Sequence, residues 1–104
     1  MTARAFAVEQ GKQDLSKPKE YGRIVYLFKA DGERSSIWSN DFPQEVLTAL
    51  EEYNYDPEND YLIVAGSMVP IALAVGRLVS QFGSIKALLY NSSEGCYISR
   101  ILGA

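Results

Sequence analysis

The fold of this chain is decided by residues 61–90, YLIVAGSMVPIALAVGRLVSQFGSIKALLY. The first five residues, 61–65, are all apolar, which is typical of a strand buried on both faces. A long apolar stretch follows, and residues 85–90 again have the composition of a strand. Two strands joined by a crossover of this length form a βαβ unit, so we predict that they run parallel and close together in one sheet.

The crossover is predicted to be a helix over residues 67–82. Ser67 is a good N-cap, because its hydroxyl can accept a hydrogen bond from an unpaired N–H of the first turn. Pro70 falls within that turn, where no intrahelical N–H is required, and Gly83 suits a left-handed residue at the end. A helical wheel predicts a narrow polar stripe made of Pro70, Arg77, Gln81 and Ser84.

The predicted helix 67–82 has more apolar surface than one that covers a single sheet face needs. One interpretation is tight packing of the whole helix against the sheet. The other is that surplus surface around Leu73, Ala74 and Arg77 contacts a second copy or a partner. The second interpretation predicts a homo-oligomer.

A β-hairpin is predicted over residues 22–39. Residues 22–28 are rich in β-branched and aromatic side chains, and Asp31-Gly32 is a strong signal for a tight hairpin turn. A two-residue loop would place Tyr26 opposite Ile37 in the second strand. Trp38 would then lie on the face that also holds Val25.

Two further elements complete the predicted fold. A helix over 41–53 has Asp41 as its cap and an ordinary amphipathic pattern. A cluster of turn-forming residues after Tyr90 indicates a C-terminal hairpin over 85–102. The fold class is therefore α/β, with a small mixed sheet, one parallel βαβ unit and two helices.

The N-terminal third is harder to assign. The chain has 104 residues, the length of a single domain, which we place at 1–104. Residues 3–8 suit either a short strand or an unpaired tail. Residues 9–20 are polar and are predicted to be a mobile loop or linker.

Composition narrows the classes of function. A formal net charge of −3 argues against a nucleic-acid-binding protein, although seven of the ten basic residues lie in residues 1–34. The single cysteine, Cys96, excludes an intrachain disulfide and favours a reducing cytoplasm. Gly66, Ser67 and Pro70 interrupt the apolar region, so the remaining helix is too short for a membrane span.

The candidate ligand site lies at the carboxyl ends of the two parallel strands, where open α/β sheets bind ligands. A helix N-terminus there offers unpaired N–H groups and a partial positive charge, which suit a phosphate or carboxylate. We therefore predict a small anionic or nucleotide-like ligand. The residues at this edge are Gly66, Ser67, Met68, Tyr90, Asn91 and Ser92.

Catalytic groups and cofactor motifs are scarce in the sequence. The chain has no histidine, so it has no histidine base, triad or metal ligand. Asp56, Glu58 and Asp60 alternate as hard oxygen ligands would, but without the glycine and closing glutamate of a calcium loop, so we expect a solvated turn. The sequence argues against an enzyme and predicts no metal and no cofactor.

The Gly66-Ser67 turn into an apolar helix resembles Rossmann-like nucleotide-sensing domains, including cyclic-oligonucleotide sensors of immunity systems. This resemblance covers about a third of the chain and concerns fold, which does not determine function. Two hypotheses remain. The protein is a non-enzymatic interaction protein that self-associates through its apolar helix surface, or it binds a small anionic ligand at the helix N-terminus.

Overall fold

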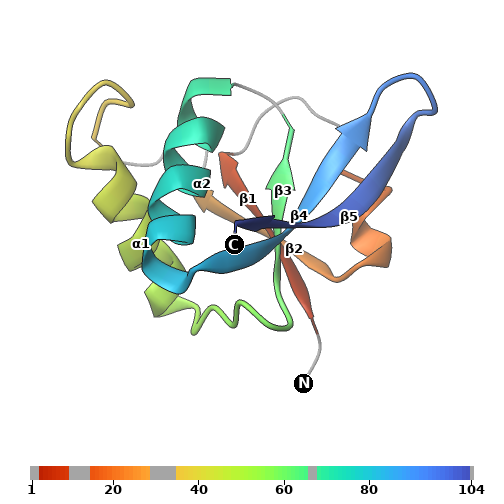
Figure 1. The fold of residues 1–104 in the computed structure, drawn as a ribbon, viewed down its shortest axis with the longest axis horizontal. Coiled ribbons are helices and arrows are strands. Elements are labelled where there is room, and N and C mark those ends of the chain that lie inside the picture. The colour runs from red at the N-terminus through yellow and green to blue at the C-terminus, as the bar shows by residue number, and fades with distance from the viewer. Residues whose placement is uncertain (1–2, 10–14, 29–34, 66–67, 104) are drawn as a thin grey trace.

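A computed structural model describes residues 3–9, 15–28, 35–65 and 68–103. Within these residues the chain forms one five-stranded sheet with α1 and α2 packed side by side on one face (Figure 1). The strands lie in the order β2-β1-β3-β4-β5. Their bounds are β1 Arg4–Glu9, β2 Arg23–Phe28, β3 Tyr61–Val64, β4 Ser84–Asn91 and β5 Cys96–Gly103. The helices are η1 Pro18–Glu20, α1 Phe42–Glu52 and α2 Met68–Phe82.

The βαβ unit and the C-terminal hairpin are confirmed. β3 and β4 are adjacent and parallel, with Tyr61 opposite Lys86, and α2 connects them. β4 and β5 are antiparallel, with Ser84 opposite Gly103. The predicted mixed α/β sheet is therefore the fold of this protein.

β1 is a central strand of the sheet. It lies between β2 and β3 and runs parallel to both. Ala5 and Phe6 are fully buried, and Ala7 and Val8 are nearly so. The alternative that residues 3–8 are an unpaired tail is thus excluded, because both faces of this strand contribute to the core.

The N-terminal strand pair differs from the predicted hairpin over residues 22–39. β2 pairs in parallel with β1, with Tyr26 opposite Ala7, and residues 36–41 form turns. Tyr26 is therefore not paired with Ile37, and the Asp31-Gly32 turn lies outside the described residues. The physical reason is that β1 offers β2 an apolar partner buried on both faces, which a local turn signal cannot reveal.

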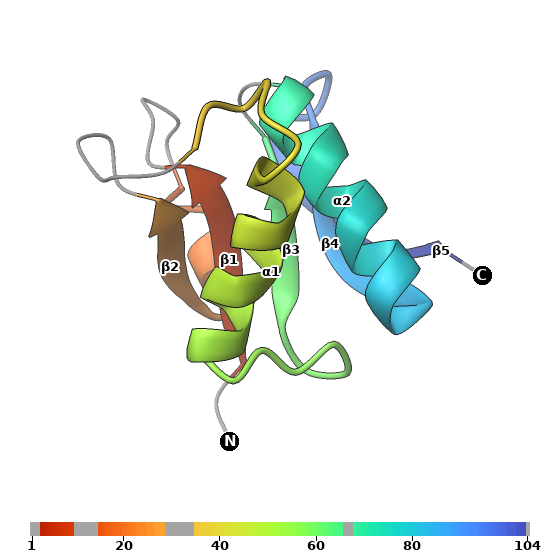
Figure 2. The same ribbon diagram turned by 90° about the vertical axis from the view of Figure 1, so that its left-hand side faces the viewer.

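The sheet has two unequal faces. Its first face packs against both helices, where Phe6, Leu62 and Ile85 meet helix residues such as Leu50 and Leu78. Its second face is covered in part by residues 15–22, which lead into β2 (Figure 2). The chain passes from β1 to β2 in one direction along the sheet, over the second face. It passes from β2 to β3 and from β3 to β4 in the other direction, over the first face. All three crossover connections therefore have the same handedness.

The predicted loop 9–20 is packed where it is described. Pro18 in η1 is buried, and Leu15 and Tyr21 pack against the cluster on the second face. The Tyr21 ring meets the Tyr61 ring edge-on, with their centroids 5.4 Å apart.

Among the described residues, no helix has the length and apolar content needed to cross a membrane.

The orientation of α2 corrects the predicted polar stripe. Pro70 is buried together with Ile71, Ala74 and Leu78 on the side that faces the sheet and α1. A proline in the first turn has no N–H to satisfy, so it can be buried without leaving an unpaired donor. Pro70 therefore belongs to the core and not to the solvent-facing stripe.

Candidate functional site

The described residues among those predicted to bind a ligand lie on different elements. Met68 begins α2 and is 76% exposed, whereas Tyr90 lies near the end of β4 and is half exposed. The Tyr90 ring packs against Tyr97 of β5, with centroids 5.3 Å apart. This tyrosine pair lies on the second face of the sheet, while α2 covers the first face. Gly66 and Ser67 lie outside the described residues.

Asn91 is the last residue of β4, and Ser92 begins the turn between β4 and β5. The Asn91 Oδ1 atom accepts hydrogen bonds from the backbone N–H of Ser93 at 3.2 Å and from its hydroxyl at 2.8 Å. These bonds stabilise the turn locally. Asn91 thus has a structural role there, and Ser92 is exposed at the tip.

The outer side of α2 is an uncharged surface. Met68, Ala72, Gly76 and Ser80 are exposed, and their spacing of four residues aligns them as one ridge along the helix. Val69, at 37% exposed, lies next to these four residues. We call Met68, Val69, Ala72, Gly76 and Ser80 together the outer ridge. A Cβ atom added at Gly76 would have no described heavy atom within 4 Å, so this space is open.

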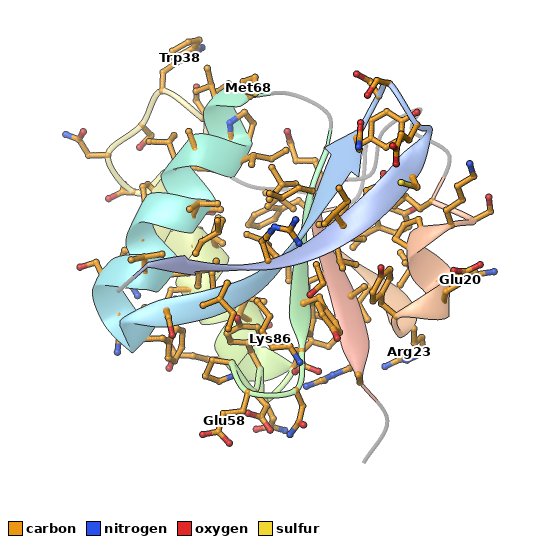
Figure 3. All side chains as sticks on the ribbon, turned by 45° about the vertical axis from the view of Figure 1, so that its right-hand side comes forward. Glu20, Arg23, Trp38, Glu58, Met68 and Lys86 are labelled. Carbon is orange, nitrogen blue, oxygen red and sulfur yellow. The ribbon has the colours of Figure 1, made fainter. Side chains whose placement is uncertain are left out.

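Trp38 extends this apolar surface. Its side chain is 77% exposed, and Figure 3 shows it beside Met68 at one corner of the molecule. The loop that holds Trp38 precedes α1 and lies near the first turn of α2 (Figures 2 and 3). Trp38 was predicted to lie in a strand and lies instead in this loop. The useful signal was a lone tryptophan among serines and asparagine in residues 35–40.

The predicted interface residues have other roles within the chain. Ala74 is fully buried, and Leu73 is half-buried and packs against the first core cluster. Arg77 donates to the side-chain oxygen of Gln44 at 3.0 Å and so links α2 to α1. The exposed uncharged surface of α2 is therefore the outer ridge, which lies to one side of Leu73 and Ala74.

An open groove of about 500 Å³ lies between β2 and α1. Its apolar lining comes from Leu27, Phe28 and Ala49, and its polar lining from Asp41, Gln44, Glu45, Thr48 and Glu52. The Glu45 carboxylate already accepts a hydrogen bond from the backbone N–H of Ser35 at 3.0 Å. The groove is acidic, and it is separate from the edge at which the sequence predicted an anionic ligand.

The amino ends of the strands carry a buried ion pair. Asp60 is 2% exposed, and its carboxylate lies 2.9 Å from the guanidinium of Arg4. The same carboxylate accepts the backbone N–H groups of Arg4 at 3.0 Å and Asp56 at 2.8 Å. Arg4 also donates to the carbonyl oxygens of Tyr53 and Asn54. The expectation of a solvated turn is therefore wrong for Asp60, which fastens the loop before β3 to the start of β1.

Tyr55 lies beside this ion pair. Its hydroxyl oxygen is buried without a hydrogen-bond partner among the described residues. Burial, followed by the negative charges of Asp60 and Asp56, raises the pKa of Tyr55 to about 12. Hydrogen bonds from the Asn59 side chain and from the Glu58 N–H lower the pKa of Asp56. In the described part of the chain, no three acidic or cysteine side chains gather as a metal site would require.

The fold and its exposed helix surface define a small α/β domain with an uncharged surface along α2. Residues 3–102 match the family described as Phage Pam3 gp32-like protein, and the chain belongs to this family. No match was found among curated proteins, and none among solved structures. The family description gives no biochemical activity, so function has to be inferred from the surface itself.

Proposed function

We propose that this protein is a non-enzymatic interaction protein that self-associates through the outer ridge of α2 and Trp38. The observation that carries the proposal is Gly76, a glycine in the middle of an exposed, uncharged helix surface. Contiguous exposed surfaces that carry large apolar side chains such as Trp38 and Met68 mark protein contacts more often than scattered ones do.

Gly76 is unfavourable for the isolated chain. A glycine in a helix interior is less stable than alanine by about 1 kcal/mol, because it loses more backbone freedom on folding. No described atom would contact an alanine methyl group at this position. Packing within the chain therefore gives no reason for glycine. A second helix that approaches α2 closely supplies the reason.

A two-fold arrangement of α2 helices fits the outer ridge. With the axis near Gly76 and the helices antiparallel, Ala72 of one copy faces Ser80 of the other, and only small side chains separate the backbones. Met68 and Trp38 then lie at both ends of the contact. Tryptophan is enriched among the residues that dominate interface energies, because it buries a large area at low conformational cost.

The experiment compares Gly76→Glu with wild type by sedimentation velocity over a range of protein concentrations. Glu at position 76 places two like charges at the centre of the symmetric contact, so self-association should weaken by at least about 100-fold. Gly76→Ala should raise the melting temperature and still weaken association, since its methyl group separates the helices. Thr48→Glu, at an exposed site on α1, is the matched control and should behave as wild type.

Two results would overturn the proposal. One is a wild-type protein that stays monomeric at several hundred micromolar. The other is a Gly76→Glu variant whose mass distribution matches that of wild type at every concentration. A loss of association that Thr48→Glu shares would point to a general effect of added negative charge and would equally count against the outer ridge.

The strand order supports a second candidate function, the binding of a small anionic or nucleotide-like ligand. The direction of the strand order reverses between β1 and β3. The strand that follows β1 in the chain, β2, lies on one side of this pair, and the strand that follows β3, β4, lies on the other side. In Rossmann-like sheets, ligands bind beyond the carboxyl ends of the strands at such a reversal. Gly66-Ser67, the predicted ligand-binding turn, comes after β3 in the sequence and lies outside the described residues. A thermal-shift screen against nucleotides tests the idea, and Gly66→Val should abolish any stabilisation.

A further inference from the structure

β5 is an edge strand whose described protection against pairing is slight: the Tyr21 hydroxyl donates to the Tyr97 carbonyl oxygen at 3.3 Å, which leaves that oxygen one free lone pair. The strand has eight residues, pairs with β4 on one side and ends the sheet in the described part of the chain. Edge strands in monomeric proteins are typically short or carry lysine, proline or a bulge. β5 has none of these, and its single charge is Arg100. Ile101, in the same strand, is 71% exposed.

The second face of the sheet is also open beside β5. The cover from Leu15 and Tyr21 reaches the cluster that includes Tyr97, whereas Ile101 projects into solvent opposite Lys86. The Lys86 Nζ atom lies 4.4 Å from the centre of the Tyr61 ring. The residue paired directly with Ile101 on β4 is therefore a lysine, and Ile101 faces an open strand edge on its other side.

The pattern of β5 is complementary to itself in the antiparallel direction. In an antiparallel pair, directly opposed residues have their side chains on the same face of the sheet. When the two strands are identical copies related by a two-fold axis, the axis therefore passes through one residue, which lies opposite the same residue of the other copy. An axis at Arg100 opposes two like charges and is unfavourable. An axis at Ser99 pairs seven positions and places Ile101 opposite Tyr97, with Arg100 opposite Ile98. An axis at Ile101 pairs only five positions.

A hydrogen bond at the centre of β5 agrees with this register. The Arg100 guanidinium donates to the carbonyl oxygen of Ser99 at 2.9 Å. That carbonyl is therefore reachable from outside the β4–β5 ladder. An exposed bond of this kind contributes little net stability, so the N–H group of a pairing strand can replace it.

We propose that β5 pairs with β5 of a second copy, antiparallel and with the two-fold axis at Ser99, to form a continuous ten-stranded sheet. This surface is separate from the outer ridge of α2 and does not depend on the function proposed above. An edge contact of seven residues is smaller than the roughly 800 Å² per partner of a standard stable interface. The pairing is accordingly weak, and covalent trapping is the suitable test.

The test uses single cysteines in a Cys96→Ser chain that is oxidised with oxidised glutathione. Ser99→Cys places two cysteines opposite each other, with Cα atoms about 5.5 Å apart, which a disulfide can bridge. Ile101→Cys places its two cysteines roughly 13 Å apart along the strands, beyond that reach. Non-reducing electrophoresis should show at least a tenfold faster dimer formation for Ser99→Cys than for Ile101→Cys.

Two controls make the result specific. Adding Ile101→Lys to the Ser99→Cys chain introduces a charge that protects the edge, and it should slow cross-linking several-fold while leaving the melting temperature unchanged. Adding Gly76→Glu should leave cross-linking unchanged, because that substitution lies on α2. The second control separates this inference from the proposed function.

The inference is overturned if Ser99→Cys and Ile101→Cys cross-link at equal rates, since random collision would then explain both. It is also overturned if Ile101→Cys reacts faster, which would indicate a different register. Finally, loss of Ser99→Cys cross-linking in the Gly76→Glu chain would mean that β5 has no pairing surface independent of α2.

Discussion

The two ends of the sheet are built in opposite ways. At the amino ends of the strands, Asp60 and Arg4 are mutually hydrogen-bonded and connect β1 to the loop before β3. At the carboxyl ends, Trp38 and Met68 extend into solvent, each more than 70% exposed. Figure 3 shows Trp38 and Met68 at the opposite end of the molecule from Glu58 and Lys86.

The difference separates stability from interaction. A buried carboxylate is tolerated only when charge and hydrogen bonds compensate for its lost hydration, so the amino end is rigidly specified. Large exposed apolar side chains contribute little to folding, because they are in water both before and after it. We therefore expect substitutions at the amino end to change stability and those at the carboxyl end to change association.

The largest expected effect is that of Asp60→Ala at the amino end. Removing the carboxylate leaves the Arg4 guanidinium without its charged partner and the N–H groups of Arg4 and Asp56 without their acceptor, and breaking a largely buried pair in this way costs about 3 kcal/mol. Urea denaturation should show this loss, whereas Glu58→Ala, an exposed carboxylate in the same loop, should stay within about 0.5 kcal/mol of wild type. A loss below about 1 kcal/mol for Asp60→Ala would contradict the assigned role.

The Asp60 network was not predictable from local sequence. Asp56, Glu58 and Asp60 form an acidic alternation that suggests a solvated turn, and Arg4 is 56 residues distant from Asp60. β1 brings the two together only because it is inserted between β2 and β3. Local signals succeeded where both partners of a contact are close in sequence, as in the βαβ unit and the hairpin of β4 and β5.

The next effect concerns Trp38→Ala at the carboxyl end. Because the side chain is exposed, the free energy of unfolding of the monomer should change by less than about 0.5 kcal/mol. Self-association should weaken by at least about tenfold, equal to about 1.4 kcal/mol, because an aromatic anchor is lost. Sedimentation equilibrium measures the second quantity, with Glu51→Ala on α1 as the control. Unchanged association would remove Trp38 from the proposed contact.

The contact surface could be predicted from sequence only in part. The surplus of apolar residues in 67–82 indicated that α2 has exposed apolar surface, but a helix that is apolar nearly all round has no clear buried side. Its rotation is set by the sheet and by α1, which bury Ala74 and expose Gly76. Trp38 was missed because the signal for a hairpin at Asp31-Gly32 placed it in a strand.

A smaller effect is expected for Tyr55→Phe, which tests how completely the amino end satisfies its polar groups. The substitution removes a buried hydroxyl that has no partner among the described residues. Losing an unsatisfied group is neutral or stabilises the fold by up to about 1 kcal/mol. Thermal unfolding at pH 7 measures this change. A loss of more than about 1 kcal/mol would show that the hydroxyl has a hydrogen-bond partner.

The same variant predicts a difference at alkaline pH. The pKa of Tyr55 is about 12 in the folded protein, against an ordinary value of 10.0. The unfolded chain therefore releases this proton first as pH rises, so the folded state loses relative stability between pH 10 and pH 12. Below pH 10 both states keep the proton and no effect is expected. Wild type should lose more stability than Tyr55→Phe across this window. Equal losses would mean that Tyr55 titrates as it does in the unfolded chain, and that its ring at the amino end is open to water.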